Sequence, residues 1–143
     1  MHPEIPTRIL SRLRPICLAL PDAREEVAWT GIRWRIRAKT FAHVLMIDGG
    51  WPPAYAKAAG TDGPACVLTF RSTLAAIDSG AFREPPFFKP VWWPDIAGMT
   101  LGNRVDWDDV SKLVQASYRM LAPRNGNPAG RRRKPISPSA SSR

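Results

Sequence analysis

The sequence contains little of what would identify a chemistry at once. Its 143 residues include two histidines and two cysteines, Cys17 and Cys66, which lie far apart within apolar runs. No CxxC pair or cysteine–histidine spacing indicates a metal site, so buried, reduced thiols are expected, although spacing alone leaves a disulfide open. A GxSxG motif, a cysteine–histidine dyad and a phosphate-binding glycine loop are also absent. We therefore predict no metal, no cofactor and no enzymatic activity.

Long apolar runs are also missing. No stretch approaches the roughly 18 consecutive apolar residues that a membrane-spanning helix needs. The N-terminus has no apolar core of the kind found in a secretory signal. Neither a membrane span nor export by that route is expected, and together with reduced thiols this predicts a cytoplasmic protein.

Acidic residues are missing from one part of the chain. The formal charge of +9 comes from 21 basic and 12 acidic residues, but no acidic residue follows Ala122. The basic residues beyond it are Arg124, Arg131, Arg132, Arg133, Lys134 and Arg143. Proline, glycine and serine accompany them, which predicts one domain over residues 1–121 and a disordered basic tail over 122–143. With six basic residues in the tail, 15 remain against 12 acidic ones, so the domain itself carries only +3.

The best-defined stretch runs from Ile32 to Ile47 and reads IRWRIRAKTFAHVLMI. Three apolar residues alternate strictly with three arginines: Ile32, Trp34 and Ile36 with Arg33, Arg35 and Arg37. A period of two predicts a strand with one buried and one solvent-facing side. If Ala38-Lys39 forms a two-residue turn, the core face gains the partners Phe41, His43 and Leu45, with His43 opposite Trp34. The arginines then share the other face with Ala42, Val44 and Met46, with Lys39 at the hairpin tip.

Helical spacing of apolar residues appears near both ends of the domain. It predicts a helix from Thr7, as its cap, to about Leu20, disturbed by Pro15, and a helix over Asp106–Leu121. Three further strands are predicted around Val27–Trp29, over Ala65–Arg71 and, at an edge, over Ile96–Leu101. A loop or weak helix over Trp51–Gly63 and a short helix over Thr73–Asp78, capped by Ser72, complete the expected elements. The fold class is α+β: an antiparallel sheet of four or five strands with the first and last helices on one face and the opposite face partly open.

Several short motifs occur together in a particular order. They are Arg14–Pro21 (RPICLALP), Glu25-Glu26, Trp29, Arg37–Ala42 (RAKTFA), Val105–Val110 (VDWDDV) and Ser117–Pro123 (SYRMLAP). In order and spacing this set resembles the MmcQ/YjbR family over roughly residues 10–123. The resemblance implies a CyaY-like α/β fold and the DNA-binding label that members commonly carry, with no agreed catalytic residues. Two features depart from the family: Ala38 stands where a turn glycine is usual, and Pro85–Leu101 is atypical around its Trp92-Trp93-Pro94 segment.

The arginine stripe is the first candidate site. Alternate residues on a strand lie about 6–7 Å apart, close to the phosphate repeat of one nucleic-acid strand. The predicted phosphate contacts are Arg33, Arg35, Arg37, Lys39, Arg71, Arg131, Arg132, Arg133 and Lys134. The competing interpretation is a solvated sheet face whose arginines are neutralised by acids on neighbouring strands. Base stacking is disfavoured because Val44 and Met46 are expected where aromatic platforms would be needed.

The second candidate is an aromatic loop over residues 82–94. Phe87, Phe88, Trp92 and Trp93 would line a ligand pocket or a partner surface, or simply cover one end of the core. His43 is interpreted as a core residue, and Asp106, Asp108 and Asp109 as the start of a helix rather than a metal site. The acidic cluster of Asp22, Glu25 and Glu26 is likewise not predicted to bind metal.

These observations lead to two hypotheses. The first is a non-enzymatic domain that contacts DNA weakly and non-specifically through the hairpin and the tail. The alternative is a protein-interaction or small-ligand-binding module that uses the aromatic loop.

Overall fold

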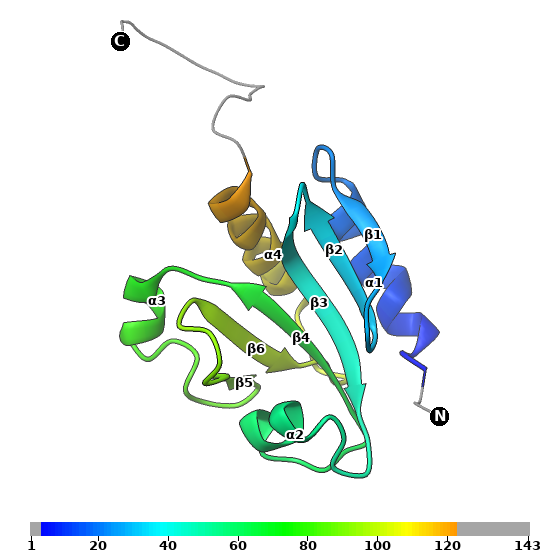
Figure 1. Cartoon of the computed structure of the whole chain (residues 1–143), viewed down its shortest axis with the longest axis vertical. Coiled ribbons are helices and arrows are strands. Elements are labelled where there is room, and N and C mark those ends of the chain that lie inside the picture. The colour runs from blue at the N-terminus through cyan, green and yellow to red at the C-terminus, as the bar shows by residue number, and fades with distance from the viewer. Residues whose placement is uncertain (1–3, 123–143) are drawn as a thin grey trace, which may run out of the picture.

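A single antiparallel sheet dominates the computed structural model of the protein, which describes residues 4–122 (Figure 1). Its six strands lie in the order β1-β2-β3-β4-β6-β5. The strands are β1 (Arg24–Val27), β2 (Ile32–Ile36), β3 (Lys39–Ile47), β4 (Ala65–Arg71), β5 (Phe87–Phe88) and β6 (Ile96–Thr100). The helices are α1 (Thr7–Leu18), α2 (Pro53–Ala59), α3 (Leu74–Asp78) and α4 (Trp107–Leu121). The predicted α+β fold is confirmed, with the two-residue strand β5 as an addition within the aromatic loop.

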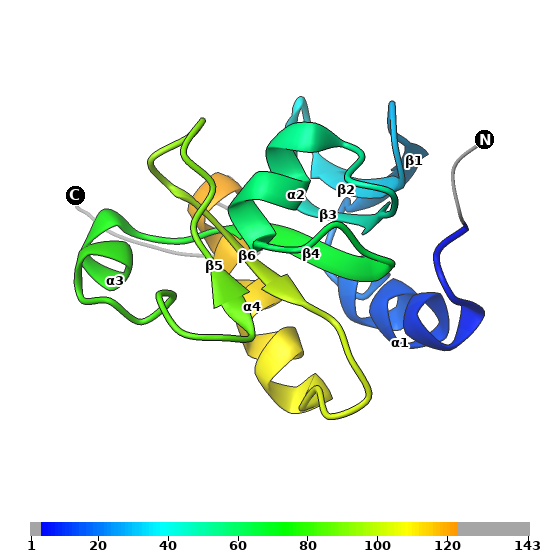
Figure 2. The same cartoon turned by 90° about the horizontal axis from the view of Figure 1, so that it is seen from below.

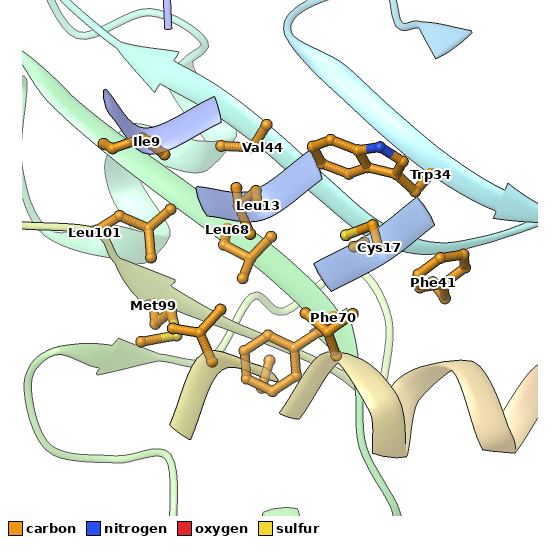
Figure 3. Packing of buried hydrophobic residues seen from close by; sticks show 14 of the residues in the cluster. Ile9, Leu13, Cys17, Trp34, Phe41, Val44, Leu68, Phe70, Met99 and Leu101 are labelled. Carbon is orange, nitrogen blue, oxygen red and sulfur yellow. The ribbon is translucent and has the colours of Figure 1, made fainter. Parts of the chain in front are cut away.

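The first and last helices pack together on one face of the sheet, as predicted (Figures 1 and 2). Their apolar stripes meet alternate residues of the central strands, and this face forms the main hydrophobic core (Figure 3). Its fully buried members include Ile9, Leu13 and Cys17 from α1, Val110 and Val114 from α4, and Trp34, Val44 and Leu68 from the sheet. Both cysteines are buried and free, and burial raises the pKa of each thiol.

The boundaries of the helices depart from prediction in small ways. Thr7 is the first residue of α1 rather than its cap, and Pro15 lies inside the helix. In α3 the cap is Thr73, whose side chain accepts from the Ala76 amide, so Ser72 lies outside. Asp106 caps α4 by accepting from the amides of Asp108 and Asp109, which confirms the helix-start interpretation of these acids.

A buried serine fastens α4 to the sheet. The Ser117 hydroxyl donates to the carbonyl oxygen of Phe41 at 2.6 Å and accepts from the amide of Arg71 at 2.8 Å. Phe41 lies where the β2–β3 register shifts, opposite Trp34 and Arg35, and Arg71 lies one residue beyond the last β3–β4 pair. Ser117 therefore satisfies two backbone groups on strands β3 and β4 with a single side chain.

The predicted register of the β2–β3 hairpin is wrong by one residue. Arg37 and Ala38 form the turn, and the register then shifts between Trp34 and Arg35, where Phe41 is an extra residue of β3. Beyond this bulge Trp34 lies opposite Ala42, and His43 lies opposite Arg33. Ala42 and Val44 are consequently in the helix-side core, and Met46 packs against it. His43 lies on the other face, together with the arginines. The bulge explains the error, because one extra residue in β3 reverses the facing of the residues beyond it, whereas the shifted turn alone would leave His43 on the Trp34 face. In the turn, Arg37 adopts the left-handed backbone conformation, with φ 56°, that glycine usually supplies.

The second face of the sheet is only partly covered. Figure 2 shows α2 on the side of the sheet opposite α1 and α4. A smaller core lies beneath α2, made of Leu45, Ile47, Ala56, Val67 and Phe88. Phe88 lies across Gly98 of β6, where a Cβ atom would overlap its ring. The remainder of this face, beside Arg33 and Arg71, stays open and is called the open face below.

Within residues 4–122, no helix has the length and apolar character needed to cross a membrane. The predicted basic tail falls almost wholly on residues 123–143, outside the described residues.

Candidate functional site

A row of side chains crosses the open face from strand to strand. Ladder pairing places Glu26 (β1) beside Arg33 (β2), Arg33 beside His43 (β3), and His43 beside Thr69 (β4). Arg71 follows Thr69 by two residues and so lies on the same face. The row places polar and charged groups from four strands along one line.

Aromatic rings surround the middle of this row and enclose a pocket of about 230 Å³. The rings come from three separate segments: Trp29 from the β1–β2 connection, Tyr55 from α2, and Trp92 and Trp93 from the β5–β6 loop. Arg33, His43, Thr69 and Arg71 line the same pocket from the sheet. The volume is below the roughly 300–1,000 Å³ of pockets for drug-sized ligands, which suits a single ring system.

Contacts between aromatic rings fix the positions of the side chains that line the pocket, which are called its aromatic walls below. The Tyr55 ring meets that of Trp92 edge to face, with centroids 4.9 Å apart, and meets His43 at 6.1 Å. Trp29 contacts Trp51 at 5.7 Å and Tyr55 at 6.4 Å. Trp29 and Trp93 nevertheless remain 66% and 55% exposed. Two large rings at the mouth of a polar pocket are an unusual use of apolar surface in a small domain.

Carboxylates engage most of the predicted arginine stripe. Glu26 binds Arg33 at 2.9 Å and Arg35 at 3.2 Å, and these hydrogen bonds lower the pKa of the Glu26 carboxyl. Arg71 pairs with Asp95 at 3.1 Å. The acids of neighbouring strands therefore partly neutralise the stripe, as the competing interpretation anticipated.

The two cations of the hairpin tip differ from the rest. Arg37 and Lys39 are exposed, and neither side chain has a carboxylate partner within residues 4–122. The predicted contacts Arg131, Arg132, Arg133 and Lys134 lie outside the described residues. Of the members of the predicted phosphate-binding set that the structure describes, only Arg33 and Arg71 line the pocket.

His43 is a buried, neutral member of the pocket. Its Nε2 lies 2.7 Å from the Thr30 carbonyl oxygen, so Nε2 carries the proton and Nδ1 accepts from the Tyr55 hydroxyl at 3.4 Å. Burial lowers the pKa of His43, the Thr30 carbonyl opposes this, and the Arg33 charge lowers it further. At neutral pH the pocket therefore contains an uncharged imidazole between two arginines.

The four aromatics of the second candidate site divide into two pairs. Phe87 and Phe88 form β5, where Phe87 packs against Phe82 and Phe88 is buried under α2, so both support the fold. Trp92 and Trp93 line the pocket. The segment is ordered against the body of the domain, as expected, but only its tryptophans take part in the candidate site.

The acidic cluster is also divided. Glu25 lies on the helix side, where it accepts from the indole nitrogen of Trp34 at 3.0 Å and pairs with Arg14 at 3.1 Å. Glu26 lies on the open face, and Asp22 is in neither contact. Among the described residues, no group of three potential ligands is placed to hold a metal ion.

Comparison with known proteins gives a fold relationship alone. No family model matches the sequence, and no curated protein does. A crystal structure of a protein from Pseudomonas syringae, from the Northeast Structural Genomics Consortium, is similar with a TM-score of 0.58 at 15% identity. The match covers 78% of this chain and 98% of that one. At this identity the likeness establishes a shared α+β architecture.

Proposed function

We propose that this chain is a non-enzymatic binding module whose open-face pocket receives one ring of a small ligand. The observation that carries the proposal is the pocket itself, with tryptophan and tyrosine rings from three segments above a polar floor. A ring inserted there gains aromatic contact on several sides and meets hydrogen-bonding groups below, the usual composition of a small-molecule site.

A tryptophan at the mouth of the pocket provides the test. A fragment screen by two-dimensional NMR on the full chain is expected to shift the indole N–H signals of Trp29, Trp92 and Trp93. Trp34 and Trp107, on the helix side, serve as internal references. Trp93→Ala should weaken binding at least tenfold, whereas Val91→Ala, in the same loop and 94% exposed, should have no effect. Fragments that shift all tryptophans alike, or none, would refute the proposal.

A second candidate is weak, non-specific binding of DNA. It is favoured by the exposed cations Arg37 and Lys39 at the hairpin tip, by the basic tail, and by the resemblance to the MmcQ/YjbR family. The corrected register also places aromatic rings, rather than Val44 and Met46, on the arginine face, so stacking of unpaired bases becomes compatible with it.

Fluorescence anisotropy with duplex and single-stranded DNA at two salt concentrations tests this second candidate. The full chain is compared with Arg37→Gln/Lys39→Gln and with a variant whose residues 131–134 are all glutamine. Loss of affinity in the hairpin variant supports a binding surface on the domain. Loss in the tail variant alone would mean a non-specific electrostatic contact.

A further inference from the structure

The charged groups that line the pocket, among residues 4–122, are all positive. Arg33 and Arg71 line it, whereas no aspartate or glutamate of that range does. From strand spacing, the Cα atoms of these arginines lie about 12 Å apart, two strands across and two residues along. At that separation the two arginines lie on either side of the ring-sized space that Trp29, Tyr55, Trp92 and Trp93 surround.

Both arginines keep donors that their carboxylate partners do not use. Arg33 directs Nε and Nη2 at a single Glu26 oxygen, at 3.0 and 2.9 Å. Arg71 uses Nη1 for Asp95. Within residues 4–122, Nη1 of Arg33 and Nη2 of Arg71 have no hydrogen-bond acceptor, and Nε of Arg71 is buried without one. A guanidinium has five donors in a planar fork, so each arginine can bind a further oxyanion while keeping its ion pair.

The local charge balance favours an anion as well. Three arginines (Arg33, Arg35 and Arg71) are accompanied by two carboxylates (Glu26 and Asp95), and His43 is neutral. The site and its immediate surroundings thus carry a net charge of about +1 before a ligand arrives.

We infer that the pocket selects a flat aromatic ring that bears an anionic group, a carboxylate or a phosphate, with the ring between the aromatic walls and the anion on Arg33 or Arg71. This inference rests on the proposed function and specifies its ligand class. Tryptophan and tyrosine faces supply contact to any flat ring, and the spare arginine donors distinguish an anion from its neutral analogue.

Matched probe pairs on the full chain test the inference. Indole-3-acetate is compared with indole-3-acetamide, and adenosine 5′-monophosphate with adenosine, by NMR titration of the Trp29, Trp92 and Trp93 indole signals. The anion of at least one pair is expected to bind about tenfold more tightly than its neutral match, because a charge-assisted hydrogen bond replaces a neutral one. The pair that shows the preference identifies the anion as carboxylate or phosphate.

Substitution of the arginines attributes the preference to them. Arg33→Gln leaves Glu26 paired with Arg35, so the fold should be retained. The anion should lose its advantage in this variant or in Arg71→Gln, according to which arginine holds it, while the neutral probe is unaffected. Arg71→Gln is the second variant, with thermal unfolding as the check on folding. Equal binding of anionic and neutral probes at the pocket tryptophans would overturn the inference and leave the binding module intact. Absence of pocket binding by all four probes would overturn both.

Discussion

The two faces of the sheet are built from the same strands but differ in composition: one face forms the main hydrophobic core, and the other carries a polar pocket. On the helix side, alternate residues of β2, β3 and β4 are apolar and fully buried against α1 and α4. On the open face, the residues between them are Arg33, His43, Thr69 and Arg71, and exposed rings stand around them. The helix side supplies the main core, so the open face is where this chain departs from what stability alone would select.

The contrast is sharpest at two adjacent glutamates. Glu25 completes the hydrogen bonding of a buried indole, and Glu26 neutralises two arginines beside the pocket. Neighbouring residues of one strand point to opposite faces, so two acids that are adjacent in the sequence have separate partners and separate roles in the structure.

The largest difference in the free energy of unfolding is expected between the replacement of a tryptophan on the helix side and the replacement of one at the pocket. Trp34→Ala removes a fully buried ring and is expected to lower the free energy of unfolding by about 3–5 kcal/mol. Trp93→Ala, at a half-exposed position, should lower it by less than about 1 kcal/mol. Urea denaturation followed by circular dichroism measures both, and equal losses would contradict the division of roles between the faces.

Ser117→Ala should produce the next largest effect. The substitution leaves the Phe41 carbonyl and the Arg71 amide without their buried partner, which costs about 1–3 kcal/mol. Ser111→Ala on the same helix is the matched control, because within residues 4–122 the Ser111 hydroxyl is hydrogen-bonded only to the Gln115 side chain, and its cost should stay within about 0.5 kcal/mol. A difference below the error of the urea midpoint would show that Ser117 does not fasten α4.

Lowering the pH should reduce the free energy of unfolding through His43 on the open face. Because burial lowers the pKa of folded His43 below the ordinary value near 6.5, neutral His43 contributes stability above that pH, and the contribution is lost as pH falls below it. The free energy of unfolding should therefore decrease from pH 7.5 to 5.5, by at most about 1.4 kcal/mol per pH unit. His43→Gln should flatten this dependence, and an unchanged slope in that variant would assign it to other groups.

The smallest effect is expected at the hairpin turn. Arg37 has φ 56°, so Arg37→Gly removes an unfavourable left-handed conformation and should stabilise the protein by about 0.5 kcal/mol. Ala38→Gly is the control: Ala38 lacks a positive φ, so glycine there should slightly destabilise. Thermal unfolding midpoints of the two variants should move in opposite directions, and parallel shifts would contradict this account of the turn.

Much of the helix side was predictable from local patterns. Strand β4 has the predicted bounds, and α4 begins one residue after its capping aspartate, because alternation, helical spacing and caps are encoded within a few residues. The hairpin register was not predictable in this way. It depended on the β-bulge at Phe41, and that one extra residue decided which face His43 occupies.

The candidate site was only half predictable. Arg33, Arg71, Trp92 and Trp93 were identified as site residues, although in separate hypotheses that the fold brings into one pocket. Trp29 and Tyr55 were not identified, because they come from a turn and from a short helix without periodic signal. The available clue was composition: an exposed tryptophan in a turn has little structural reason to be there.

Glu26 has a consequence for how relatives of this protein diversify. It neutralises Arg33 and Arg35 without itself lining the pocket, so its replacement would change the local charge without removing a side chain that lines the cavity. For the proposed binding pocket, the preferred charge of the ligand would then change by substitution at a position that does not line the cavity. Surveys that compare only the contacting residues would then group together proteins whose ligands differ in charge.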